Sequence, residues 1–344
     1  MADTVAEKRR IRWHLYRTFK PYLTCAQLLC TAPPCCAGWL LEQWSLGSYF
    51  KQARLLLTAS ILTSVVICGA RAIVQLVELP MPFFTSVLYV NEVVLGVVIC
   101  FMAVNRGFSE RVRCQDIVDA ILTVASAIPY TDWTDSLRYA RLRLQGICAT
   151  FVIVCAVALL CDYLHFGSVY ATLFTLCAYL LPNVLAGVSI VQYCVGNLLV
   201  YKLQQNINRR LSSADIILEE HLGETKHLYL QLAYCATVLT RSYEVLILTN
   251  VFAGINVTSL QLLEIYQYLQ QTETNAIYVA YNVLWIFLQL YMLLIVIYPN
   301  DMLKREIFIA LLSFMIILIQ FDSSNLNKHN GEVTAIDSLY NAHS

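Results

Sequence analysis

The feature that most constrains this chain is a series of apolar runs of about 20 residues, separated by charged stretches. A helix of about 20 residues crosses the hydrocarbon core of a bilayer, which is about 30 Å thick. Hydrophobic residues make up 58% of the 344 residues and charged residues only 13%, against about 25% charged in a soluble domain. The apolar excess must face lipid. The sequence therefore predicts an all-α membrane protein embedded in the lipid bilayer.

The arrangement of basic residues predicts how the chain crosses the membrane. Seven windows reach spanning length, near 53–76, 83–104, 145–164, 168–200, 244–266, 277–298 and 303–321. Cytosolic loops retain Lys and Arg. With the N-terminus inside, the segments 1–54, 105–144, 201–243 and 299–306 are cytosolic and hold 21 of the 23 Lys and Arg residues. We therefore predict seven transmembrane helices, a cytosolic N-terminus and an extracellular C-terminus.

Three segments follow from this topology. Residues 1–51 form a cytosolic N-terminal segment, where Pro33-Pro34 interrupts an apolar stretch and favours a membrane-surface helix. Counting 21–41 as an eighth span would instead place the N-terminus outside. Residues 52–321 form the seven-helix domain, with a helical cytosolic segment at about 201–243 that packs with an extension of the fourth span. Residues 322–344 form a polar extracellular tail.

Polar groups within spans are costly and often functional. Asn91 and Glu92 fall in the second span, Asn183 beside Pro182 in the fourth, and Gln289 in the sixth. Hydrogen bonds between helices are the alternative explanation for such residues. Of these residues, we single out Glu92 as a candidate for ligand binding.

Aromatic residues gather toward the predicted outer halves of the spans. An interfacial aromatic belt explains such a distribution, and so does the lining of a small-molecule pocket between helices. With Glu92, the candidates for the pocket are Tyr89, Tyr163, Tyr170, Tyr281 and Trp285.

Several functional classes find no support in the sequence. The net charge is zero, and no basic stripe interleaved with aromatics indicates nucleic-acid binding. No nucleotide-binding or zinc-protease motif is present, the six histidines are scattered, and most of the 13 cysteines lie within apolar runs. We therefore predict no enzymatic activity, no cofactor, no metal site and no nucleic-acid partner.

The last predicted span carries the most specific pattern in the chain. Residues 313–321 read Ser-Phe, five apolar residues, then Gln320-Phe321. This resembles the C-terminal signature of the insect gustatory receptor family, Thr-Tyr, five apolar residues, Gln-Phe, with Ser313 and Phe314 as departures. The stretch from Trp285 to Glu306 is also similar to the sixth span and its exit in that family. The resemblance covers roughly residues 52–325.

The resemblance implies a ligand-gated cation channel that senses small-molecule tastants in the plasma membrane of sensory neurons. It further implies a homo- or heterotetramer whose last helices line the pore, with a ligand pocket in the outer half of spans two to six. Ile316, Gln320 and Phe321 are then the candidates for the pore and its gate. One departure concerns assembly: from Glu306 to Phe321 there are 16 residues, and the longer cytosolic loop usual in the family before the motif is missing.

Other receptor and transport classes remain as alternatives. An odorant receptor of the same superfamily would differ in ligand more than in architecture. A G-protein-coupled receptor requires an extracellular N-terminus, contrary to the distribution of Lys and Arg. A transporter would tend to show internal repeats, and we find none that is convincing.

Overall fold

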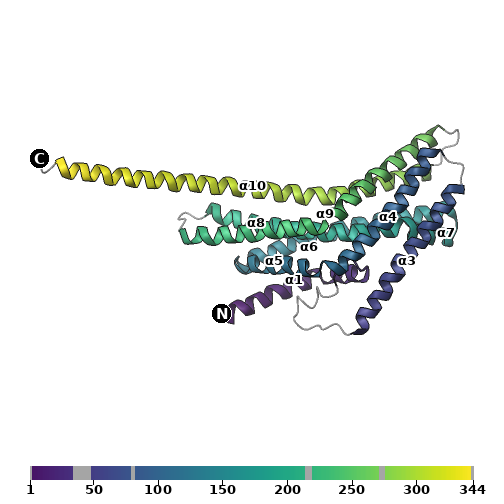
Figure 1. Cartoon of the computed structure of the whole chain (residues 1–344), viewed down its shortest axis with the longest axis horizontal. Coiled ribbons are helices and arrows are strands. Elements are labelled where there is room, and N and C mark those ends of the chain that lie inside the picture. Colours follow the sequence, from purple (N-terminus) through teal and green to yellow (C-terminus); the bar gives the residue numbers. More distant parts are fainter. Residues whose placement is uncertain (1, 34–47, 79–81, 214–218, 271–275, 342–344) are drawn as a thin grey trace.

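A computed structural model describes residues 2–33, 48–78, 82–213, 219–270 and 276–341, and the side chains of its last helix only as far as Leu312. Every regular element in these ranges is a helix (Figure 1). The helices are α1 (Ala2–Leu28), α3 (Ser48–Glu78), α4 (Phe83–Ser109), α5 (Arg111–Ser126), α6 (Tyr130–Phe166), α7 (Val169–Thr175), the π-helix η1 (Leu176–Leu180), α8 (Leu181–Ser213), α9 (Glu219–Leu269) and α10 (Ala276–Asn341).

Six stretches of the described chain are long and apolar enough to cross a membrane. They are Gln52–Leu76, Phe83–Ser109, Tyr130–Leu164, Val169–Arg209, Gly223–Leu269 and Ile277–Ile309. Large apolar side chains such as Ile153, Leu248 and Leu290 project from their outer faces, as a lipid environment requires. These stretches overlap the first six predicted windows and confirm an all-helical membrane protein.

The centre of the bundle is α8. It packs against α4, α6, α9 and α10, and half of its apolar window is buried, the largest share of the six. One apolar core surrounds it among the spans, and a second lies at the end where α1 packs on α5 and α6. Ile11, Leu15 and Phe19 of α1, spaced four residues apart, enter this second core. The N-terminal helix is thus part of the packed bundle.

The fourth apolar run changes its helix type directly before Pro182. Between α7 and α8 the chain widens into η1, the π-helical segment that ends directly before Leu181 and Pro182. Proline lacks an amide hydrogen, and kinks and π-segments are common where the regular ladder loses a donor. Tyr179 of η1 lines a cavity described below.

The end of the chain differs from the predicted topology. The predicted sixth and seventh spans, 277–298 and 303–321, lie on one uninterrupted helix, α10, with Pro299 inside it. No glycine or second proline follows Pro299 before Phe321 to end the helix. Consequently α10 continues beyond the other helices, and its C-terminal end lies toward the same end of the molecule as the N-terminus (Figure 1).

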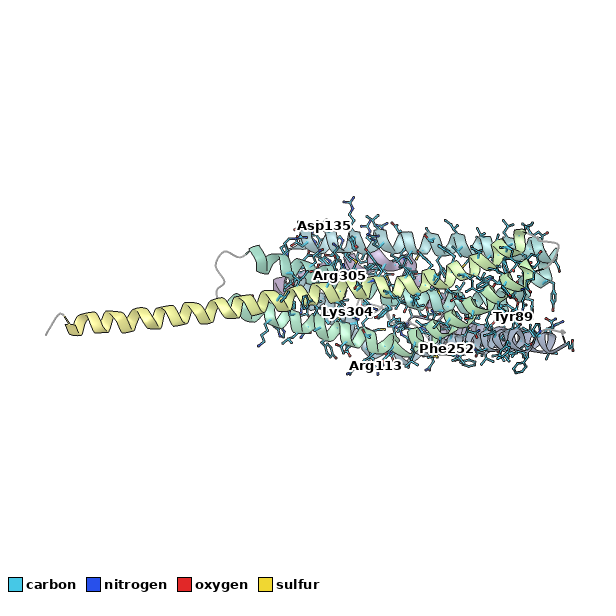
Figure 2. The ribbon with its side chains drawn as sticks, turned by 90° about the horizontal axis from the view of Figure 1, so that it is seen from above. Tyr89, Arg113, Asp135, Phe252, Lys304 and Arg305 are labelled. Carbon is cyan, nitrogen blue, oxygen red and sulfur yellow. The ribbon has the colours of Figure 1, made fainter. Side chains whose placement is uncertain are left out.

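Three labelled basic residues lie in one half of the bundle. Lys304, Arg305 and Arg113 lie in the half nearer the distal part of α10, whereas Tyr89 lies toward the opposite end (Figure 2). The C-terminal ends of α3, α6 and α9 lie at the Tyr89 end. Under the orientation that the distribution of basic residues predicts, the Tyr89 end would face outward.

Candidate functional site

A cavity of about 260 Å³ opens between the helices at the Tyr89 end of the bundle. The α4, α6, α9 and α10 helices form its walls, together with the last residue of α7 and with η1. Its lining residues are Tyr89, Glu92, Cys161, Asp162, Thr175, Tyr179, Gln261, Glu264, Ile277, Tyr278, Tyr281 and Trp285. The size lies just below the range of about 300–1,000 Å³ typical of small-molecule sites, so the cavity suits a small ligand.

Four of the six pocket candidates meet in this cavity: Tyr89, Glu92, Tyr281 and Trp285. The rings of Tyr281 and Trp285 pack edge to face, with centroids 6.2 Å apart. The structure does not bring Tyr163 and Tyr170 into the cavity, because their side chains are 47% and 65% exposed. An exposed position near the end of a span matches the aromatic belt.

Two acidic residues in the cavity wall escaped the sequence analysis. Asp162, near the end of α6, accepts a hydrogen bond from the Thr175 hydroxyl at 3.0 Å. Glu264, near the end of α9, accepts one from the Tyr278 hydroxyl at 2.9 Å. Both carboxyl groups are buried. With Glu92, the wall carries three carboxyl groups from three helices, and no Lys, Arg or His is among its described lining residues.

The signal that could have found Asp162 and Glu264 is their position in the sequence. Each is an acidic residue within one helical turn or two of the outer end of an apolar run, where a charge is easily taken as the boundary of the span. The helix ends in question lie at one end of the bundle, as alternating spans require.

Amide side chains form the layer below the cavity. Gln289 of α10 donates to Asn183 of α8 at 3.0 Å, and Asn183 donates to the Tyr179 carbonyl oxygen at 2.9 Å. Asn91 of α4 donates to Asn256 of α9 at 2.8 Å. These contacts match the interhelical hydrogen bonds that the sequence left as an explanation for Asn91, Asn183 and Gln289. A smaller cavity of about 20 Å³ shares Glu92 with the large one and reaches this layer.

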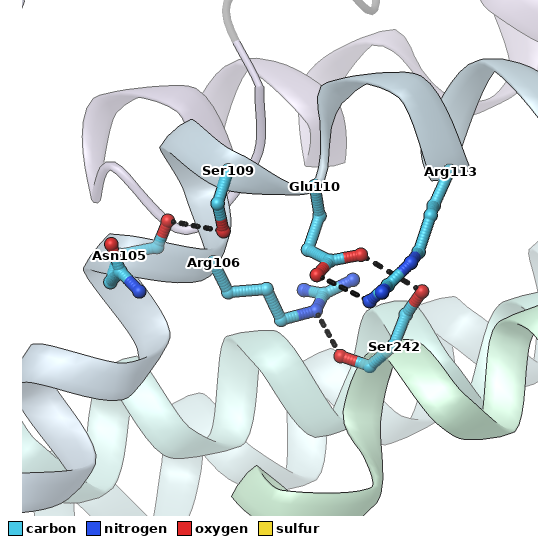
Figure 3. A network of polar contacts seen from close by, with 6 residues as sticks. All are labelled: Asn105, Arg106, Ser109, Glu110, Arg113 and Ser242. Atoms are coloured by element: carbon cyan, nitrogen blue, oxygen red, sulfur yellow. Dashed lines mark hydrogen bonds and ion pairs between the residues drawn. The ribbon is translucent and has the colours of Figure 1, made fainter.

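A second polar cluster lies where the C-terminal end of α4 meets the middle of α9 (Figure 3). The buried guanidinium of Arg106 donates to the Ser242 carbonyl oxygen at 3.0 Å and to Gln192 Oε1 at 3.1 Å. Its central carbon lies 3.2 Å from the centroid of the Tyr243 ring, a cation–π arrangement. Nearby, Glu110 accepts from Ser242 Oγ at 3.1 Å and pairs with exposed Arg113 at 2.7 Å. This cluster ties α4, α8 and α9 together.

The chain after α1 is held against the same region. Arg54 of α3 is buried and donates to the carbonyl oxygens of Ala32 at 2.7 Å and Gly107 at 3.2 Å. The backbone of Cys30 crosses Gly107 so closely that a Cβ placed there would meet the Cys30 oxygen at 2.0 Å. Only glycine permits this approach.

The pore candidates Ile316, Gln320 and Phe321 lie on the distal part of α10. Their side chains are outside the described residues, so the structure assigns them no contacts.

Comparison with known proteins identifies a family with which this chain shares sequence similarity. The family described as 7tm Chemosensory receptor matches residues 19–307, which is most of the chain. The match runs from α1 through the part of α10 that lines the cavity and packs on α8, and it ends before residues 313–321. No curated protein matches the chain.

Proposed function

Because the chain belongs to the 7tm chemosensory receptor family, we propose that it is a gustatory receptor subunit that binds small-molecule tastants and acts as a ligand-gated cation channel. The observation that carries the proposal is the cavity at the outward end, whose aromatic and polar wall draws on four long helices. The site of action is then the plasma membrane of sensory neurons.

Ligand binding acts on gating only through a difference in affinity between two arrangements of the helices. The cavity wall contains Tyr281 and Trp285 of α10, and the same helix carries Ile316, Gln320 and Phe321 farther along. A ligand that draws α10 toward α4 and α9 therefore changes the position of the helix on which the proposed pore residues lie.

The proposed pore requires α10 to turn back across the membrane. Pro299 removes one helical hydrogen bond, and Lys304 and Arg305 follow as cytosolic residues under the positive-inside rule. A break there returns 303–321 across the bilayer as a seventh span, with the C-terminus outside. Four such helices, from a homo- or heterotetramer, place Ile316, Gln320 and Phe321 around one axis, where an aromatic ring closes the pore by excluding water.

Phe321→Ala tests the pore assignment. We expect altered gating and ion selectivity in whole-cell recordings from cells that express the chain, because removal of the ring widens the proposed constriction. Phe308→Ala is the matched control on the same helix, since Phe308 is 61% exposed, and its currents should equal those of the natural chain. Currents from Phe321→Ala that keep their gating and selectivity would contradict the assignment.

Epitope tags at the two ends test the topology. An N-terminal tag should bind antibody only after permeabilisation, because the basic segments at that end favour the cytosol. A tag accessible on intact cells would favour a G-protein-coupled receptor instead. The C-terminal tag should be accessible on intact cells if α10 turns at Pro299. A cytosolic C-terminal tag means that the chain crosses six times, as the unbroken α10 implies, and the channel proposal then fails.

A further inference from the structure

The charge on the wall of the large cavity is one-sided. Glu92, Asp162 and Glu264 contribute carboxyl groups from α4, α6 and α9, and no basic side chain is among the described lining residues. Asp162 and Glu264 each accept a hydrogen bond from a neutral hydroxyl. Glu92 makes no hydrogen bond or ion pair within the described part of the chain. Asp162 and Glu264 are buried and Glu92 is half-buried; carboxylates withdrawn from water without a positive partner are costly, so the cavity offers three acidic groups to a ligand of opposite charge.

The spacing of the carboxyl groups argues against a metal ion as that ligand. No group of three His, Cys, Asp or Glu residues among the described residues is placed to hold a metal. The acids line different walls of a 260 Å³ space, whereas a hard divalent cation draws its oxygen ligands to about 2–2.6 Å. The cavity thus has room for a molecule between its acids.

The remaining wall is aromatic. Tyr89, Tyr179, Tyr278, Tyr281 and Trp285 line the same space. Faces of Tyr and Trp attract organic cations, and rings that surround a cation are a recurrent way to bind ammonium groups. Aromatic rings beside carboxylates therefore favour a ligand with a cationic nitrogen and an apolar body.

An unused hydrogen-bond acceptor points the same way. Gln261 of α9 lines the cavity and is 6% exposed. Its Oε1 accepts no hydrogen bond from the described residues, and a buried acceptor without a donor is unfavourable. The missing partner must be a donor, such as an N–H group of a bound molecule.

From these observations, we propose that the ligand of the cavity is a small organic cation, a primary ammonium or guanidinium compound with an aromatic or aliphatic body. The nitrogen pairs with Glu92 and the acids beside it, and the body packs on Tyr281 and Trp285. The inference rests on the proposed receptor function and specifies its ligand class. A neutral polyol would use the same acceptors but would leave the three acids without a counter-charge.

Equilibrium binding to the purified full chain in lipid nanodiscs tests the inference without any need for channel activity. Phenethylammonium is the cationic probe, 2-phenylethanol its neutral counterpart of the same shape, and sucrose the polyol. Trp285 lies in the wall, so binding is read from tryptophan fluorescence and checked by equilibrium dialysis. We expect the ammonium compound to bind about tenfold or more tightly than the alcohol, because only the cation pairs with buried carboxylates.

Isosteric variants locate the effect. Glu92→Gln, Asp162→Asn and Glu264→Gln should each weaken phenethylammonium binding by about tenfold and leave 2-phenylethanol binding unchanged. Glu244→Gln is the control, since Glu244 is an exposed acid on α9 away from the cavity. The probe comparison on the natural chain does not depend on how any variant folds.

The outcomes separate this inference from the proposed function. Equal affinities for the ammonium compound and the alcohol, tighter binding of sucrose, or unchanged affinity in all three variants would overturn the cation assignment. If only neutral compounds evoke currents, the proposed receptor channel function stands and the proposal of a cationic ligand is rejected. Selective binding of the ammonium compound without any evoked current would support the cation site and contradict the proposed channel function.

Discussion

Arg106→Ala is expected to lower the free energy of unfolding by about 3 kcal/mol. The substitution removes hydrogen bonds to Ser242 and Gln192 and the cation that lies 3.2 Å from the Tyr243 ring. It also leaves a cavity and a carbonyl oxygen without its donor at the junction of α4, α8 and α9. Unfolding in mixed detergent micelles, followed by tryptophan fluorescence, measures the change.

Arg113→Ala is the matched control for this experiment. Arg113 lies in α5, the helix that follows α4. Its side chain is 54% exposed and forms an ion pair with Glu110 at 2.7 Å. Exposed ion pairs contribute about 0–1 kcal/mol, so the control should remain near the natural stability. Equal losses in the two variants would mean that burial of Arg106 adds nothing to its contribution.

Gly107→Ala is expected to destabilise the protein by about 3 kcal/mol, the upper part of the range for overpacking. The new Cβ would lie 2.0 Å from the Cys30 oxygen and 3.0 Å from the Cys30 carbonyl carbon. These are backbone atoms, so a rotamer change cannot relieve the clash. The segment after α1 must move away from α4 and lose its hydrogen bonds to Arg54. Protease sensitivity of this segment and micellar unfolding report the change.

Gly146→Ala provides the contrast on α6. A Cβ at Gly146 meets nothing within 4 Å, and alanine is favoured over glycine within a helix by about 1 kcal/mol. This variant should therefore be neutral or slightly more stable. A stable Gly107→Ala protein with an unchanged cleavage pattern would show that the close approach to Cys30 is not required.

The spans were predictable because each is a local property of the sequence. An apolar run near Phe83–Ser109 or Tyr130–Leu164 can be recognised without knowledge of its neighbours. The course of α10 was not predictable in this way. A reversal between residues 298 and 303 depends on whether the membrane or other subunits stabilise it. Helix propensity alone continues the helix through Pro299.

The candidate site was predictable only in part. Tyr89, Tyr281 and Trp285 stood out as aromatic residues in the outer halves of spans, and Glu92 as an acid within one. Tyr163 and Tyr170 met the same criterion but project outward, because position along a span does not specify which face a residue occupies. Gln261 and Glu264 require knowledge of how α9 is rotated against α4 and α10, which depends on packing across the whole bundle.

The length of α10 bears on the survival of the protein in a cell. As one helix of 66 residues, it is about 100 Å long, and it carries the apolar run 307–321 past the end of the bundle. Outside a bilayer or an assembly, such a run exposes a surface that chaperones and proteases recognise. A molecule that fails to insert or bury this run is therefore a substrate for degradation, and cellular abundance becomes a direct measure of how the last apolar run is accommodated.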